Sequence, residues 1–124
     1  MKIKAAVLRE SGRRRPYADS LPLGIEEVEL DPPSKGEVLV QIKAVGLGHS
    51  DLAAISGERA RPLPMVIGHE ASGIVAEVGP DVEGLAPGDH VVAAFVASCG
   101  QCDLCREGRP ALCPIAGAAN MAGT

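Results

Sequence analysis

Alternating apolar and polar positions predict a chain of short strands. Residues 2–8 end in the apolar run Ala-Ala-Val-Leu, and residues 25–30 alternate apolar and acidic side chains. The clearest period of two follows the turn at 32–36, where apolar residues occupy positions 38, 40, 42 and 44 and polar ones occupy 41 and 43. Residues 73–79 and 90–95 predict two further strands, the second of them buried.

Turn-forming residues separate these strands and predict one short helix. Gly46 and Gly48 interrupt the third strand, and Ser50 or Asp51 is placed to cap a helix over 52–55 that stops at Gly57. Residues 11–24 and the proline-rich segment 62–64 are predicted to be loops. Residues 116–124 are small and carry no core-forming pattern, so this tail is expected to fray.

Composition fits a single, mainly β domain. The 124 residues suffice for one core, and 46% of them are apolar, although there is one Phe, one Tyr and no Trp. The core must therefore consist of aliphatic side chains. Fifteen Gly and ten Pro favour a turn-rich β protein over a helical bundle.

The net charge and the hydropathy of the chain limit the kinds of molecule that it is expected to bind. A net charge of −4 gives no reason to expect nucleic acid, and the triplet at 13–15 is too short to change that. The N-terminus passes directly into a strand pattern without the apolar region of a secretory signal. No stretch approaches the roughly 18 apolar residues of a membrane span. We expect a cytoplasmic protein with no membrane or nucleic-acid partner.

All four cysteines lie in one segment with the spacing C-x2-C-x2-C-x7-C: Cys99, Cys102, Cys105 and Cys113. Four thiolates so close together suit one tetrahedral zinc ion with a closed coordination sphere, which is a structural site. Two disulfides would close very small loops, and a redox C-x-x-C would leave two cysteines unused. An iron–sulfur cluster also takes four cysteines, and the spacing alone leaves it open.

The order of motifs resembles the zinc-dependent medium-chain alcohol dehydrogenases. It runs through the segment 46–51, the tripeptide 68–70 (Gly-His-Glu), the glycine–valine pattern of 73–79, the Gly-Asp-His-Val of 88–91 and the cysteine lobe. The likeness covers essentially the whole chain. It implies that residues 1–124 form the family's N-terminal catalytic domain, a GroES-like, partly open β-barrel with a zinc lobe at 95–115. It also implies that the four cysteines hold one structural zinc ion per chain.

The resemblance further implies a remnant catalytic site made of His49, Ser50, Asp51, His69 and Glu70. In the family a cysteine occupies the position of Gly48 as a ligand of the catalytic zinc, a histidine occupies that of His69, and a third ligand lies further downstream. Gly48 has no side chain to donate. A catalytic zinc needs about three protein ligands and one open position. His69 is therefore expected to be a vestigial ligand, and Asp51 is expected to pair with it when no metal is bound.

The family reaction interconverts alcohols and carbonyl compounds with NAD(P). In it, zinc polarises the substrate oxygen, a hydroxyl at the position of Ser50 relays the proton, and the side chain at 49 extends the relay or meets cofactor phosphates. A dinucleotide site needs G-x-G-x-x-G within a βαβ unit, and the segment 46–51 lacks the last glycine. NAD(P) would bind only if a Rossmann domain were supplied elsewhere.

Three functions stay open from the sequence. The first is a catalytic-domain fragment of an alcohol dehydrogenase-like oxidoreductase, truncated and inactive alone. The second is a stand-alone, non-catalytic GroES-like zinc module, which Gly48 favours. The third is a zinc-independent reductase, against which the intact cysteine lobe counts. Without a Rossmann domain, an apolar interface would be left exposed, so we expect a homo-oligomer.

Overall fold

The computed structural model places the strands in two open, three-stranded antiparallel sheets and describes residues 1–95 and 98–122. The first sheet has the order β2 (Leu23–Glu29), β1 (Lys2–Leu8) and β4 (Met65–Val66); the second has β3 (Val38–Gly46), β5 (Glu70–Val78) and β6 (His90–Ala93). Residues 96–97 of the expected zinc lobe and 123–124 of the expected tail lie outside the described residues. No closed barrel forms, which confirms the mainly β, partly open architecture.

The segments whose apolar and polar residues alternate are the ones that pair as strands. β1 and β2 pair over their full length from Lys2–Glu29 to Leu8–Leu23. β3 and β5 pair from Val38–Val78 to Gly46–Glu70 with two register shifts. Such irregularities bend a strand and turn its side chains, which lets an open sheet curve.

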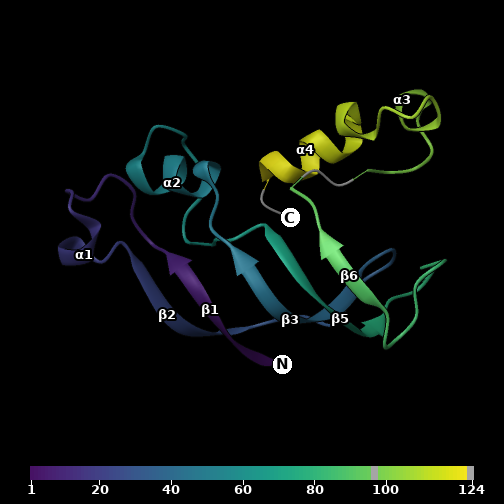
Figure 1. Cartoon of the computed structure of the whole chain (residues 1–124), viewed down its shortest axis with the longest axis horizontal. Helices are drawn as coiled ribbons and strands as arrows, with labels where there is room; N and C mark the ends of the chain where they lie inside the picture. Colours follow the sequence, from purple (N-terminus) through teal and green to yellow (C-terminus); the bar gives the residue numbers. More distant parts are fainter. Residues whose placement is uncertain (96–97, 123–124) are drawn as a thin grey trace.

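In the described part of the chain, four helices and one 3-10 turn lie between and after the strands: α1 (Tyr17–Ser20), α2 (His49–Ser56), α3 (Asp103–Arg106), η1 (Pro110–Leu112) and α4 (Pro114–Ala122). Figure 1 shows the strands along the lower side of the molecule, with α2 above β1 and β3, and with α3 and α4 in a lobe above β6. Among the described residues, no helix has both the length and the apolar character required to span a membrane.

The core lies where α2 packs on the first sheet. Leu8 is completely buried and forms a cluster with Ala54, Ile55 and Ile67. Aliphatic side chains fill it, as the scarcity of aromatic residues requires. Burying a side chain such as Leu8 removes about 1.5–3 kcal/mol of unfavourable hydration. This cluster therefore fixes α2, and with it the residues at the start of the helix, against the sheet.

The predicted start of the helix after the third strand was wrong, and its predicted end was right. The helix begins at His49 with Gly48 as its N-cap, not Ser50 or Asp51, because the carboxylate of Asp51 reaches back to the N–H of Gly48 at 2.8 Å. That bond is one half of a capping box and lets the helix start earlier. The predicted stop is confirmed, since Gly57 ends the helix with a left-handed φ of 85°.

The tail and the last strand also differ from expectation. Residues 114–122 form α4, because Pro114 suits a first helical position and the alanines that follow are strong helix formers. Ala116 is buried within this helix. β6 is not buried: Val92 is 84% exposed, because β6 is an edge strand and none of the described segments covers that face. The predicted loop at 11–24 contains the single turn α1 and the first residues of β2.

Candidate functional site

The four cysteines come together, as their spacing predicted, in a lobe formed by α3, η1 and the start of α4. Their four sulfur atoms all lie within 4.8 Å of one another. The Sγ atoms of Cys99 and Cys105 are 3.9 Å apart, and those of Cys102 and Cys113 are 4.0 Å apart. Four sulfurs at Zn–S bonds of about 2.3 Å around one ion would be about 3.8 Å apart. The arrangement fits one tetrahedral ion.

Local backbone structure aims the sulfurs at this point. The N–H groups of Gln101 and Cys102 donate to the sulfur of Cys99 at 3.4 and 3.3 Å, and the N–H of Ala116 donates to that of Cys113 at 3.5 Å. N–H donors to sulfur stabilise thiolates, which are the metal-binding form. Since the donors come from residues two or three positions later, the chain can form these bonds within single turns.

The same surroundings shift the thiol pKa values in different directions. Backbone hydrogen bonds, first that from Ala116, lower the pKa of Cys113 to about 6. The N–H of Gln101, followed by that of Cys102, lowers the pKa of Cys99. Desolvation raises the pKa of Cys105 to about 11. Thiolates crowded together cannot all ionise without a cation, so the cluster is built for a positive ion.

The arrangement of the four cysteines also distinguishes between the kinds of cysteine site that the sequence left open. All four cysteines are free rather than paired in disulfides. An iron–sulfur cluster contains several metal and sulfide ions, and its cysteine ligands must stand farther apart than the ligands of a single ion. Sulfurs within 4.8 Å of one another leave room for one ion. A closed set of four sulfur ligands is characteristic of structural sites.

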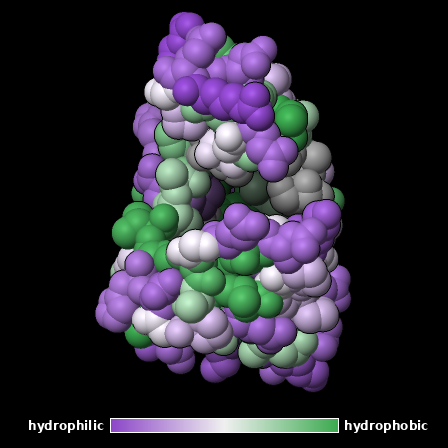
Figure 2. Space-filling view, turned by 90° about the vertical axis from the view of Figure 1, so that its right-hand side faces the viewer, coloured by the Kyte–Doolittle hydropathy of each residue, from purple (hydrophilic) through white to green (hydrophobic). Residues whose placement is uncertain are grey.

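The second candidate site lies at the junction of β3, α2 and β5. A cleft of about 810 Å³ is lined by Gly48, His49, Ser50, Asp51, His69 and Glu70, which includes every residue of the predicted remnant site. Figure 2, which looks at the right-hand side of Figure 1, shows a hollow below the upper lobe with hydrophobic residues beside it. Concave sites of this volume commonly take small molecules.

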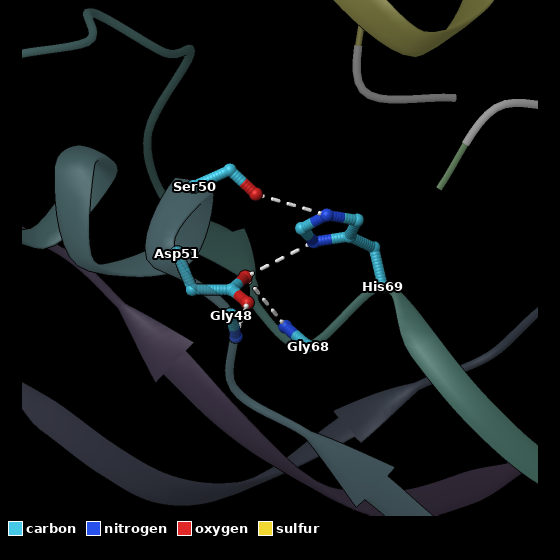
Figure 3. A network of polar contacts seen from close by, with 5 residues as sticks. All are labelled: Gly48, Ser50, Asp51, Gly68 and His69. Carbon is cyan, nitrogen blue, oxygen red and sulfur yellow. Dashed lines mark hydrogen bonds and ion pairs between the residues drawn. The ribbon is translucent and has the colours of Figure 1, made fainter. Parts of the chain in front are cut away.

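A chain of hydrogen bonds joins three of these residues (Figure 3). Asp51 Oδ1 lies 3.2 Å from His69 Nδ1, and the other ring nitrogen of His69, Nε2, lies 3.0 Å from Ser50 Oγ. The pairing of Asp51 with His69 was predicted, and the contact of Ser50 with the opposite nitrogen was not. Because the carboxylate accepts the Nδ1 proton, Nε2 is left to accept the hydroxyl proton of Ser50.

Asp51 is the most firmly held residue of this hydrogen-bonded chain. Its side chain is 4% exposed and accepts two backbone N–H bonds, from Gly48 at 2.8 Å and Gly68 at 3.0 Å. Gly68 adopts a φ of 95°, where side chains are strained, and an added Cβ would come within 2.7 Å of Val45. Glycine at 68 therefore allows the backbone to present its N–H to Asp51.

The other predicted residues line the cleft with fewer contacts. His49, the first residue of α2, and Glu70, the first of β5, are both exposed. The ring of Phe95 meets that of His69 edge-on with centroids 6.3 Å apart. Arg59 also lines the cleft. Sequence reasoning missed Phe95 and Arg59, because neither belongs to a motif and both reach the cleft only through the fold.

These residues do not fit a catalytic zinc ion as the cysteine lobe fits a structural one. Gly48 supplies no ligand atom, and Nδ1 of His69 is bonded to Asp51, which leaves Nε2 as the one nitrogen of this ring that could bind a metal. Among the described residues, the cysteine cluster is the one group of three or more His, Cys, Asp or Glu side chains close enough to share an ion. The backbone does not require glycine at 48, since its φ of −90° is open to any residue.

The comparisons with known proteins agree with this architecture. The profile of the alcohol dehydrogenase GroES-like domain matches residues 34–124. The NDMA-dependent alcohol dehydrogenase of Amycolatopsis methanolica is 46% identical over 93% of this chain, and the S-(hydroxymethyl)glutathione dehydrogenase of Photobacterium damsela subsp. piscicida is 44% identical over 91%. The chain spans 29% of the length of each of these relatives.

Solved structures give the same result. A Burkholderia ambifaria protein described as an alcohol dehydrogenase zinc-binding domain protein superimposes with a TM-score of 0.87 at 40% identity, covering all of this chain and 31% of the other. Benzyl alcohol dehydrogenase from Acinetobacter calcoaceticus gives 0.84 at 35% identity, covering 100% and 32%. The chain belongs to the alcohol dehydrogenase GroES-like domain family.

Proposed function

We propose that these 124 residues form the catalytic-domain portion of an NAD(P)-linked alcohol/carbonyl oxidoreductase and bind one structural zinc ion. The observation that carries the proposal is the set of four sulfurs within 4.8 Å of one another, in a chain of this family. Cys99, Cys102, Cys105 and Cys113 would hold the ion. Bound zinc would supply folding free energy to the lobe rather than chemistry.

The proposal includes that this chain does not oxidise alcohols by itself. Gly48 removes a side-chain ligand from the cleft, and the sequence holds no complete G-x-G-x-x-G. The residues that remain would still place a substrate: the Ser50 hydroxyl can donate or accept one hydrogen bond, and Nε2 of His69 can accept its proton. Small alcohols or aldehydes are the substrate class, by analogy with the relatives' names.

Elemental mass spectrometry of the purified protein tests the metal assignment. One zinc per chain is expected, and Cys113→Ser is expected to bind at least tenfold less zinc because a closed site has lost a ligand. Ser98→Ala, just outside the ligand set, is the matched control. Absence of both zinc and iron from the wild type would refute the assignment, and iron with an absorption band near 400 nm would replace it with an iron–sulfur cluster.

A second candidate function is a stand-alone zinc-binding module without catalysis, which the glycine at 48 favours. The two are separated by adding NAD+ or NADP+ with a panel of primary alcohols and recording absorbance at 340 nm. Reduction of the nicotinamide by the isolated chain would overturn the proposal that it is inactive alone. Activity restored only by mixing with a separately produced cofactor domain would favour the oxidoreductase over the stand-alone module.

The proposal includes self-association through exposed apolar side chains. Six large hydrophobic residues on the second sheet, on β4 and in the adjoining loops are at least half exposed: Ile42, Val45, Leu47, Val66, Val92 and Phe95. Monomeric proteins rarely leave contiguous apolar surface of several hundred Å² in water. Sedimentation velocity is expected to show dimers at micromolar concentration and monomers after Val92→Lys. A strict monomer at high concentration would contradict this part of the proposal.

A further inference from the structure

The three residues of the cleft have the arrangement of a nucleophile, a base and a buried acid that orients the base. Ser50 Oγ contacts His69 Nε2 at 3.0 Å, and His69 Nδ1 contacts Asp51 Oδ1 at 3.2 Å. Both distances lie in or near the range in which such groups exchange protons. The order of exposure also fits: the carboxylate is buried, while the side chain of His69, which lines the cleft, is 39% exposed.

We propose that Ser50 is a nucleophile for acyl transfer and that this chain hydrolyses small carboxylic esters without a catalytic metal or a nicotinamide cofactor. The inference goes beyond the proposed function and uses other atoms than the cysteine lobe. It rests on the disagreement between the cleft and a zinc site. With no side chain at Gly48, the side chains present form a hydrogen-bonded set of proton donors and acceptors, and they fall short of the three protein ligands of a catalytic zinc.

Each atom has a defined part in the reaction. Ser50 Oγ attacks the ester carbonyl carbon while its proton passes to His69 Nε2. The carbon–oxygen bond to the alcohol then breaks, the leaving oxygen takes that proton, and the acyl group stays on Ser50. Water repeats the sequence: it gives a proton to Nε2 and attacks the acyl carbon, and Ser50 Oγ recovers the proton. The sum is ester plus water to acid plus alcohol, with no change of oxidation state.

The start of α2 supplies a stabilising environment for the developing negative charge. Ser50 is the second residue of this eight-residue helix, and the side chain of Asp51 takes the N–H of the N-cap residue Gly48. The N–H groups of a first helical turn lack intrahelical acceptors, and the helix dipole places partial positive charge there. An ester carbonyl next to the Ser50 hydroxyl would therefore lie beside donors suited to an oxyanion.

The cleft sets the substrate class. Its volume of about 810 Å³ suits a small ester, and apolar side chains on the β4 side and Phe95 line it beside the polar chain. Asp51 touches no substrate in this scheme and is a positioning residue. It holds Nδ1 protonated, so that Nε2 is free to take the hydroxyl proton.

The test uses the zinc-loaded 124-residue protein with p-nitrophenyl acetate and p-nitrophenyl butyrate. Zinc keeps the four thiols from reacting. Ser50→Ala and His69→Gln are expected to lower kcat/KM by at least about a hundredfold, since a positioned base typically contributes that much. Ser56→Ala is the matched control: Ser56 lies on the same helix, donates to the carbonyl of Ala53 and does not line the cleft.

Two further readouts separate a catalytic role from a structural one. A fluorophosphonate should label the wild type on Ser50, as located by peptide mass spectrometry, and should fail to label His69→Gln. Asp51→Asn should lower kcat with KM unchanged. Hydrolysis that persists in Ser50→Ala, or labelling at another residue, would overturn the inference. Either result leaves the zinc content, and with it the proposed function, unaffected.

Discussion

Replacing Asp51 by alanine is the sharpest test of how the cleft is held together. The side chain is 4% exposed and accepts hydrogen bonds from the N–H groups of Gly48 and Gly68 at 2.8 and 3.0 Å, and it pairs with His69 at 3.2 Å. It therefore ties the end of β3 to the start of β5 through α2. Alanine removes all three contacts while leaving the helix propensity high.

The expected cost follows from the groups left without partners. Each half-buried N–H that loses its acceptor costs about 1–2 kcal/mol, and loss of a negative charge in the first helical turn costs about 0.5 kcal/mol more. The sum is about 3 kcal/mol for Asp51→Ala. For a domain of this size that corresponds to a fall in Tm of roughly 10 °C.

Urea denaturation of the zinc-loaded protein, followed by far-UV circular dichroism, measures the change in unfolding free energy. Asp89→Ala is the matched control, because Asp89 also accepts an N–H three residues back, that of Ala86 at 2.8 Å, but in an exposed turn. Its loss should cost about 0.5–1 kcal/mol. If the losses of unfolding free energy in the two variants differ by less than about 0.5 kcal/mol, burial does not make the contacts of Asp51 more stabilising than those of Asp89.

Three further predictions concern the second sheet, the cleft and the surface. Gly48→Cys should change the unfolding free energy by less than about 1 kcal/mol in a urea titration, because a Cβ at 48 would have no neighbour closer than 3.7 Å. Gly73→Ala should cost about 3 kcal/mol in a urea titration, since its Cβ would come within 2.5 Å of the carbonyl oxygen of Gln41. The hydrogen bond from Arg9 lowers the pKa of Glu26 in the folded protein. This interaction therefore stabilises the fold fully above the pKa that Glu26 has in the unfolded chain, and the stabilisation is lost as the pH falls through the pKa of Glu26 in the folded protein. Glu26→Gln should thus lose less stability than wild type between pH 7 and pH 3.

The strands and the cysteine cluster were predictable because their signals are local. The alternation of apolar and polar residues over 38–44 indicates a strand, whichever strands it pairs with. Four cysteines within fifteen positions can reach one point through turns alone. The burial of β6 was not predictable in the same way. An apolar run such as Val91-Val92 indicates that a face is suited to burial, and whether another segment covers it depends on the rest of the fold.

The hydrogen bonds between Ser50, His69 and Asp51 could be predicted only in part from the sequence. Ser50 and Asp51 are adjacent in sequence, yet their contacts with His69 cross 19 and 18 positions. The resemblance to the family brought the three residues to attention, and the pairing of Asp51 with His69 in the absence of metal was a separate hypothesis about those residues. The contact of Ser50 with the opposite ring nitrogen depends on the side chain's orientation at the start of α2, which no pattern in the sequence reports.

The glycine at 48 shows why the cleft is better explained by its hydrogen bonds than by a missing metal. Its backbone angles of −90° and −180° are open to all residues, and the space beside it would admit a Cβ at ordinary contact distance. The fold therefore imposes no glycine there. What the local structure does fix is the N–H of this residue, donated to Asp51, and through Asp51 the orientation of the His69 ring. Those contacts need no side chain at 48, so they persist when the ligand is absent, and they leave Nε2 of His69 directed at a hydroxyl.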